Sequence, residues 1–330
     1  MNMIKIFKLY GSLLLILILL NFFLPRLMPG GPLEYLEGQE SGATLTEQQK
    51  NSMIEYYGLN DSMAEQFIDY IVGIVQFDFG FSYTYKLPVN DIIMDHISYT
   101  LWIVGISSVL SIVIGIFLGL LSGWVHHKKG DKTFMSTMLA IGALPEFLFG
   151  MLLLIVFGVM LDMLPMSGAH TPFMDSESIW VKVNDAAKYA ILPIVTLTMV
   201  NLTRIYLLVR NETIQVASSP YIEFAKMKGV REIRLVFRHA FKNVLIPIFT
   251  LIMIRIGYTF TGAIFVETLF SYPGIGQLLK ESILSRDYPL MHGLFLLFAV
   301  MILICNALAD FIYPKLDPRV RGGKHVEKVL

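Results

Sequence analysis

Runs of about 20 apolar residues recur along this chain, and they constrain its fold more than any other feature. A helical run of that length crosses a hydrocarbon layer of about 30 Å. Inside lipid every unpaired backbone polar group is costly, so each run is expected to be an α-helix. The runs lie near 8–26, 98–125, 134–164, 189–210, 244–268 and 289–313. The sequence therefore predicts an all-α, polytopic membrane bundle of about six transmembrane helices.

The composition supports the membrane class and argues against soluble and nucleic-acid-binding classes. Hydrophobic residues make up 55% of the 330 residues and charged residues only 16%, which is too little charge to cover the surface of a soluble protein of this size. The formal net charge is zero, so there is no basic excess to neutralise phosphates. We therefore expect a lipid bilayer, and no nucleic acid, among the partners.

The first apolar run begins like a secretory signal peptide, because Lys5 and Lys8 precede it. A signal peptide has an apolar core of about 7–15 residues and a cleavage site of small residues. Here the run is longer and ends in Pro25-Arg26 without such a site. The sequence predicts a retained transmembrane helix.

Lysine and arginine placement predicts the orientation in the membrane. Basic residues concentrate at 126–133, at 211–243 and from 315 onward, which are the segments that follow every second span. Cytoplasmic loops carry such an excess. Both termini are therefore expected in the cytoplasm.

The chain divides into two parts in this interpretation. Residues 1–97 would hold the first transmembrane helix and an extracytoplasmic segment, whose semi-apolar pieces predict short helices packed on the outer face. Residues 98–330 would form a five-helix core with a cytoplasmic segment at 211–243.

The cytoplasmic segment contains the most informative pattern. Helix-forming residues run up to Gly229, a residue type that readily takes a positive φ and ends a helix, and a second short helix is expected after it. Basic residues at steps of three and four predict one charged face: Arg231, Arg234, Arg238 and Lys242. This face could lie on anionic lipid head groups. Alternatively, the small Ala225 could let a partner surface approach closely.

The pattern Glu223-x-Ala225-x-x-x-Gly229 resembles the EAA loop of ABC importer permeases, a coupling helix that inserts into a groove on the ATPase. The rest of the chain resembles the first, or B-type, permease of the oligopeptide, dipeptide and nickel branch. The likeness covers nearly the whole chain. Its motifs occur in the order of that branch, at 28–32, 57–60, 77–80, 164–168, 266–276, 286–289 and 316–319.

The resemblance implies a type I ABC importer permease fold in the bacterial cytoplasmic membrane. It implies a subunit that forms the pathway for di- and oligopeptides with a second permease. Two cytoplasmic ATPases and an extracytoplasmic substrate-binding protein would complete the complex. Within the same branch, nickel or another small solute is the alternative substrate.

The chain lacks a phosphate-binding loop of its own, because Gly322-Gly323-Lys324-His325 has neither the earlier glycine nor the final serine or threonine of that motif. We therefore expect no enzyme activity and no bound cofactor in this chain. ATP would be hydrolysed by the partner subunits.

Two sets of site residues follow from the resemblance. The predicted ATPase-coupling residues are Glu223, Phe224, Ala225, Gly229, Arg231, Arg234 and Arg238. Phe224 departs from the family, which usually has alanine there. The predicted docking loop for the binding protein contains Glu267, Tyr272, Pro273, Gly274 and Gly276. The alternative interpretation is that its proline and glycines only shape a tight turn.

Two charges inside predicted spans, Glu146 and Arg255, mark a candidate translocation pathway. Members of the resembling family usually carry small or uncharged polar residues at both places. The helical rise puts both charges about 20 Å from the cytoplasmic ends of their spans. Charges at that depth pair or face water. We hypothesise an ion pair, with separate exposure to an aqueous cavity, or a misplaced span boundary, as the alternatives. Arg204, nearer a span end, is assigned to snorkelling.

Two other function classes have some support in the sequence. A secondary transporter would work without ATP and would not need a coupling loop. An intramembrane serine protease would need a histidine within reach of Ser107 in Gly105-Ile106-Ser107, and His292 is the nearest candidate. No metal site is expected, since the histidines lack metal-ligand spacing.

Overall fold

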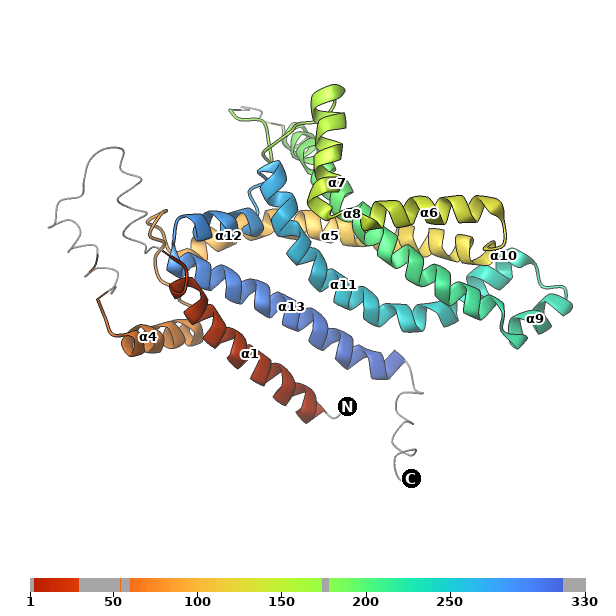
Figure 1. Cartoon of the computed structure of the whole chain (residues 1–330), viewed down its shortest axis with the longest axis horizontal. Coiled ribbons are helices and arrows are strands. Elements are labelled where there is room, and N and C mark those ends of the chain that lie inside the picture. Colours follow the sequence, from red (N-terminus) through yellow and green to blue (C-terminus); the bar gives the residue numbers. More distant parts are fainter. Residues whose placement is uncertain (1–2, 30–53, 55–59, 174–177, 317–330) are drawn as a thin grey trace.

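The computed structural model of the chain describes residues 3–29, 54, 60–173 and 178–316 (Figure 1). In this described part every element of regular structure longer than a single bridge is helical. The α-helices are α1 (Met3–Arg26), α4 (Met63–Gln76), α5 (Val89–Trp124), α6 (Lys129–Ala143), α7 (Glu146–Leu153), α8 (Ile179–Ala217), α9 (Pro220–Met227), α10 (Glu232–Arg234), α11 (Phe241–Phe270), α12 (Ile275–Leu284) and α13 (Tyr288–Leu316). Two π-helices occur, η1 (Leu154–Met160) and η2 (Leu235–Ala240).

The long helices fall where the apolar runs predicted them. Among the described residues, four helices are long and apolar enough to cross a membrane: residues 8–26 of α1, α5, α8 and residues 288–312 of α13. A bent pair formed by α6 and the α7–η1 segment brings the number to as many as five. The expected run 244–268 lies within α11. The prediction of an all-α membrane bundle is confirmed.

The centre of the bundle is a close contact between α5 and α8 that small residues make possible. Gly115, Gly119 and Gly123 recur every four residues on α5 and face α8. A Cβ at Gly119 would lie 2.6 Å from the Cβ of Val209, so no larger residue fits there without a shift of the backbone. Small residues with this spacing let membrane helices approach closely.

One predicted span is bent. The run 134–164 was expected to be a single helix, but α6 and the α7–η1 segment meet at 104° (Figure 1). The break falls at Leu144, whose ψ of 134° is extended, and Pro145 is the N-cap of α7. Proline disfavours helical geometry in the residue before it and donates no backbone hydrogen bond, which explains the break.

Short helices cover the expected outer end. Helix α4 starts with a capping box, in which Ser62 and Glu65 satisfy each other's backbone N–H groups. It confirms one of the helices predicted for residues 27–97. Helix α12 was not predicted, since 269–288 was expected to be only a short loop. The motifs at 28–32, 57–60 and 316–319 lie largely outside the described residues.

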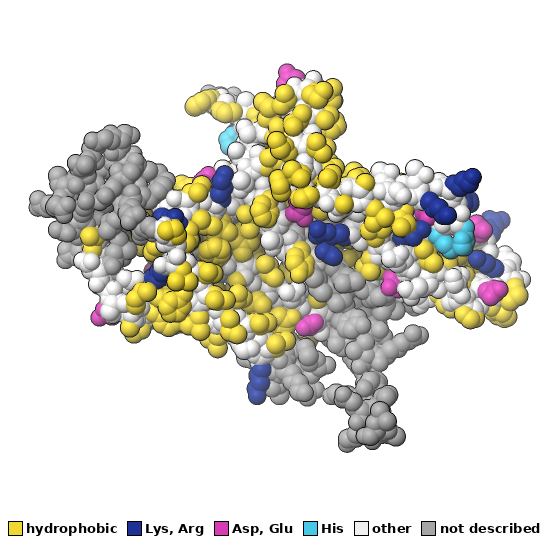
Figure 2. Space-filling view, viewed as in Figure 1, with side chains coloured by type: hydrophobic (Ala, Val, Ile, Leu, Met, Phe, Trp, Pro, Cys, Tyr) yellow, Lys and Arg dark blue, Asp and Glu magenta, His cyan; other side chains and the backbone are white. Residues whose placement is uncertain are grey.

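The start of α1 and the end of α13 point away from α4 and α12 (Figure 1). Tyr10 of α1 donates a hydrogen bond of 2.9 Å to Asp310 of α13, which holds the two helices together. Figure 2 shows lysine and arginine side chains gathered at the end of the molecule that carries α9 and α10, and hydrophobic side chains over much of the surface elsewhere. This distribution fits the positive-inside rule with α9 on the cytoplasmic side.

Candidate functional site

The segment predicted to couple to an ATPase is a short helix on a tight connection. Helix α8 ends at Ala217 and helix α9 starts at Pro220, so only Ser218 and Ser219 lie between them. Proline is favoured at the first helical position because its missing N–H would be unpaired there anyway. Gly229, with φ +75°, follows the C-cap of α9. The prediction that this glycine ends the first short helix is confirmed.

Helix α9 is anchored by one side and presents apolar side chains on the other. Ile222 has no exposed surface. Tyr221, Phe224 and Met227, at steps of three, are 44%, 55% and 75% exposed. Glu223 is also exposed and Ala225 is half-buried. Phe224, the departure from the resembling family, therefore adds an apolar ring to the outward face.

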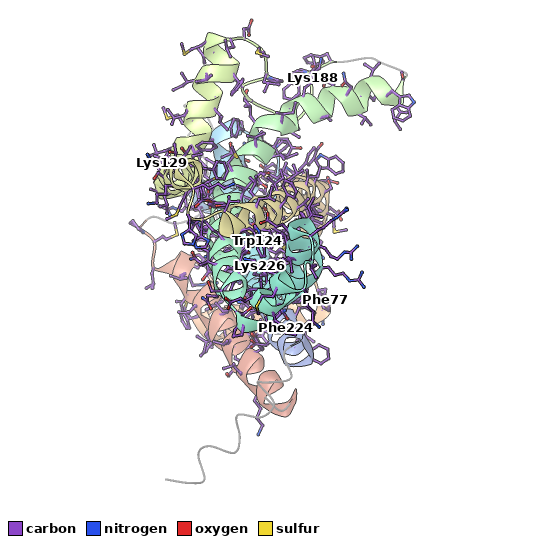
Figure 3. All side chains as sticks on the ribbon, turned by 90° about the vertical axis from the view of Figure 1, so that its right-hand side faces the viewer. Phe77, Trp124, Lys129, Lys188, Phe224 and Lys226 are labelled. Atoms are coloured by element: carbon purple, nitrogen blue, oxygen red, sulfur yellow. The ribbon has the colours of Figure 1, made fainter. Side chains whose placement is uncertain are left out.

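Contacts to α5 and α11 hold the coupling segment against the end of the bundle (Figure 3). The Lys226 Nζ lies 5.0 Å above the ring of Trp124, the last residue of α5. Such cation–π contacts contribute about 0.5–1 kcal/mol at exposed sites. Asn243 of α11 donates a 2.7 Å hydrogen bond to the Tyr221 hydroxyl. A displacement of α9 would therefore act directly on both helices.

The predicted basic residues are exposed but do not lie on one continuous α-helix. Arg231 is the N-cap of α10, Arg234 is its last residue and Arg238 lies in η2. The wider turn of a π-helix changes the direction in which successive side chains point. The expected single charged face is therefore interrupted, and a coupling role for these arginines stays a prediction.

A buried polar network, which the sequence reasoning missed, lies between the ends of α5, α6 and α8. Arg210 donates a 2.6 Å hydrogen bond to Asp131, and its Nε donates a 3.1 Å bond to the Ser122 hydroxyl. Ser122 also bonds to Asp131 and to the Tyr206 hydroxyl. Because a buried charge needs a partner, this network fixes the turn between α5 and α6.

At the opposite end of the bundle, Glu267 holds the loop that leads into α12. Its carboxylate has no exposed surface. It accepts hydrogen bonds from the Thr100 hydroxyl at 2.6 Å and from the backbone N–H groups of Gly276 and Gln277 at 2.7 and 3.2 Å. These N–H groups belong to the first turn of α12, where a negative charge is stabilising.

The two glycines of this loop leave room for the Glu267 carboxylate. A Cβ at Gly274 would collide with the carboxyl group, and one at Gly276 would lie 2.7 Å from its Oε2. Neither glycine has a positive φ; the left-handed conformation is taken by Ser271, with φ 46°. Close approach to the buried carboxylate, and at Gly276 also to the backbone of Ile264 at 2.6 Å, is thus the reason for glycine here.

The predicted docking residues mostly face their own chain. Glu267 and Tyr272 are 0% and 2% exposed, Gly274 and Gly276 are buried, and Pro273 is half-buried. Burial also raises the pKa of Tyr272 to about 12. A docking role stays a prediction, and these buried side chains would serve it by fixing the shape of the loop.

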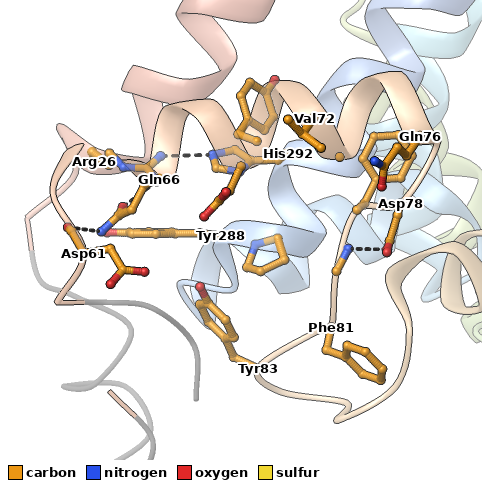
Figure 4. Close-up of a pocket in the computed structure, with 16 residues that line it drawn as sticks. Arg26, Asp61, Gln66, Val72, Gln76, Asp78, Phe81, Tyr83, Tyr288 and His292 are labelled. Atoms are coloured by element: carbon orange, nitrogen blue, oxygen red, sulfur yellow. Dashed lines mark hydrogen bonds between the residues drawn. The ribbon is translucent and has the colours of Figure 1, made fainter. Parts of the chain in front are cut away.

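A polar pocket of about 600 Å³ opens near this end, between α1, α4 and α13 (Figure 4). Arg26 in its wall donates to the Phe22 carbonyl at 2.7 Å and to Gln66 at 2.9 Å. Its guanidinium lies 3.6 Å from the centre of the Phe22 ring. The rings of Tyr70, Tyr83, Tyr288 and His292 line the pocket. No single motif predicts it, because its walls come from three distant parts of the chain.

The hypothesised ion pair between Glu146 and Arg255 is not formed. In the described part of the chain neither residue makes a salt bridge, and the Glu146 carboxylate lies against Gly262, two helical turns beyond Arg255. The side chain in electrostatic range of both is Arg204 of α8. In the sequence, Arg204 lies nearer a span end, which indicates snorkelling. Hydropathy does not give the direction in which a side chain points, so the sequence could not place Arg204 near Glu146.

The protease geometry is also absent from the described residues. The Ser107 hydroxyl donates to the Val104 carbonyl at 3.1 Å, and the His292 ring lies beside Arg26. These two side chains therefore have other partners. Among the described residues no three histidine, cysteine, aspartate or glutamate side chains are grouped to hold a metal ion.

Residues 111–322 match the family model described as the binding-protein-dependent transport system inner membrane component. This chain belongs to that family. Its members are membrane permease components of ABC transporters and are not themselves the catalytic subunits. The membership agrees with the apolar helices of the bundle, and it makes the chain a multi-pass membrane permease.

Curated relatives resemble the chain over nearly its full length. It is 30% identical over 309 residues to the oligopeptide transport system permease protein AppB of Bacillus subtilis, covering 93% of this chain and 95% of the relative. It is 31% identical to the glutathione transport system permease protein GsiC of Escherichia coli, covering 93% and 94%. The dipeptide transport system permease protein DppB of Escherichia coli is 29% identical, with the same coverage.

Proposed function

We propose that this permease is one of two membrane subunits of a peptide importer, driven by two cytoplasmic ATPases and supplied by an extracytoplasmic binding protein. Full-length similarity to permeases named for oligopeptides, dipeptides and glutathione supports the substrate class. Nickel or another small solute is the alternative within the branch. In this proposal both termini lie in the cytoplasm.

The observation that carries the coupling role is the exposed apolar face of α9. Tyr221, Phe224 and Met227 project from a helix whose opposite side is held by the buried Ile222. An amphipathic helix of this kind fits into a groove on a partner. The ATPase would supply that groove, and Glu223, Ala225 and the arginines at 231, 234 and 238 would line its rim.

Transport would follow from movement of α9. Contacts at Trp124 and Asn243 connect α9 to α5 and α11, the helices that continue to the outer loop around Glu267. Rigid-body rocking of these helices against the second permease would open the pathway alternately to each side. Glu146 and Arg255 are proposed to line that pathway.

The experiment measures uptake of a labelled dipeptide in cells that lack their own peptide importers and express the whole transporter. Because aromatic side chains in interface centres dominate binding energy, Phe224→Ala should lower uptake about tenfold or more. Phe173→Ala is the matched control, since this fully exposed ring lies in the expected outer loop. Equal uptake by wild type and Phe224→Ala would contradict the coupling role. Uptake of nickel but not dipeptide would favour the alternative substrate.

A further inference from the structure

Three helices bring charged side chains to one level within the bundle. Arg204 lies 13 residues before the end of α8, and Arg255 lies 14 residues after the start of α11. Glu146 follows the 15-residue helix α6 and starts α7. At 1.5 Å per helical residue, Arg204 and Arg255 each lie about 20 Å from the ends of α8 and α11 that lead toward α9 and α10, and Glu146 lies one length of α6, also about 20 Å, from the start of α6. Arg255 lies at the middle of the 30-residue apolar helix α11, so this level falls in the part of the bundle that is expected to lie inside the membrane.

The charges at this level do not cancel. Arg204 attracts the Glu146 carboxylate and repels the Arg255 guanidinium. Among the described residues, these two guanidinium groups and one carboxylate lie at this level, which leaves an excess of positive charge. Within the described residues Arg255 has no acidic partner, and the side chains that act on its charge are Arg204 and Tyr258.

These side chains are accessible from outside the chain. Arg204 is exposed, while Glu146 and Arg255 are half-buried. Tyr258, 59% exposed, has its ring 5.8 Å from the Arg255 guanidinium. Figure 2 shows acidic and basic side chains together near the foot of α7, beside hydrophobic surface. Charges at this depth are too costly to face lipid, so the face must border water or the second permease.

We propose that Arg204 and Arg255, with Tyr258 beside them, form a subsite on the translocation pathway for a carboxylate of the passing substrate. For a peptide this group is its C-terminal carboxylate. Guanidinium groups bind carboxylates through paired, charge-assisted hydrogen bonds. The excess positive charge at this level attracts such an anion. Glu146 offsets part of that charge, which allows the carboxylate to leave. The inference rests on the proposed function and adds the chemical group that is recognised.

The test uses the complete transporter in proteoliposomes with its binding protein. Uptake of labelled trialanine is compared with uptake of its C-terminal amide in wild type, Arg204→Gln and Arg255→Gln. The same binding protein serves every variant, so its own preference cancels when ratios are compared. We expect the acid-to-amide uptake ratio to fall about tenfold in each variant, the loss typical of one charge-assisted contact. Arg255→Lys should restore part of the ratio.

Lys188→Gln is the matched control, because it removes a positive charge from the outer part of the same helix α8 and should leave the ratio unchanged (Figure 3). Unchanged ratios in both arginine variants would overturn the subsite. So would an equal loss of acid and amide uptake, which would show that the arginines pair with an acidic residue of the second permease. If the Arg255→Gln variant fails to assemble, the uptake ratio of the Arg204→Gln variant alone tests the subsite, because Arg204 is exposed. Absence of uptake by wild type would instead contradict the proposed peptide function.

Discussion

Glu267 and Asp287 are carboxylates without exposed surface that hold the segments around α12. The Glu267 carboxylate accepts hydrogen bonds from backbone N–H groups at the start of α12. The Asp287 carboxylate accepts hydrogen bonds from the Ser82 hydroxyl at 2.5 Å and from the Thr84 N–H at 3.0 Å. These bonds hold the 81–88 segment against the start of α13. At the scale of the residue, buried charge in this protein fixes loops that would otherwise be free to move.

The close fit of Gly274 to Glu267 gives a testable residue pair. Gly274→Ala should lower the free energy of unfolding by about 1–3 kcal/mol, because the new methyl group collides with the carboxylate. In a Glu267→Ala background the same change should cost much less, since the obstacle is gone. Thermal unfolding in detergent measures both effects. Gly105→Ala, with no neighbour within 4 Å of the added Cβ, should be nearly neutral. Equal costs in both backgrounds would contradict the assignment.

At the scale of elements, hydropathy predicted the position of the long helices but not their shape. The run 134–164 reads as one span because Leu144-Pro145 adds no charge to it, yet the proline bends the chain by 104°. Helix α12 was not predicted because Gly274 and Gly276, at its N-cap and in its first turn, are typical of a tight turn. The structure shows that they make room for Glu267.

For the candidate site, too, the sequence predicted the local features but not the contacts that depend on tertiary packing. The end of α9 at Gly229 follows from local backbone preference, so sequence alone located it. The grouping of Glu146 with Arg204 depends on how α7 and α8 rotate about their axes, which tertiary packing decides. For the same reason the sequence could not show that Glu267 faces inward.

The turn after α9 can be tested through Gly229, whose φ of +75° strains any side chain. Gly229→Ala should destabilise the coupling segment by about 1–2 kcal/mol and reduce ATP hydrolysis stimulated by the loaded binding protein. Gly229→Asn should retain more activity, because asparagine tolerates this conformation better. Gly130→Ala is the control, since Gly130 lies in the first turn of α6 with open space around it. Full activity in Gly229→Ala would show that the turn can relax.

At the scale of the whole molecule, the helices connect two chemically different ends. The end with α9 and α10 carries exposed arginines and lysines, and the opposite end carries α4, α12 and the polar pocket. The grouping of basic residues predicts that the α9 end is cytoplasmic.

Cysteine labelling in intact cells checks this orientation. With Cys305 replaced by alanine, cysteines at Asp78 and Lys188 should react with a membrane-impermeant maleimide from outside. Cysteines at Lys129 and Lys226 should react only after permeabilisation, because these exposed positions lie at the start of α6 and in α9, at the end of the bundle opposite α4 (Figure 1). Labelling of the Lys226→Cys variant from outside would contradict the orientation and the coupling role together.

Helix α8 has a mechanical consequence. It runs unbroken from the Arg204 level to Ala217, about 20 Å, and only Ser218 and Ser219 separate it from α9. A helix of that length behaves as a stiff rod, with no joint at which a push could be absorbed. In the proposed transport mechanism, a displacement of α9 would therefore tilt α8 at the level of Arg204, because one continuous helix joins that level to the turn before α9.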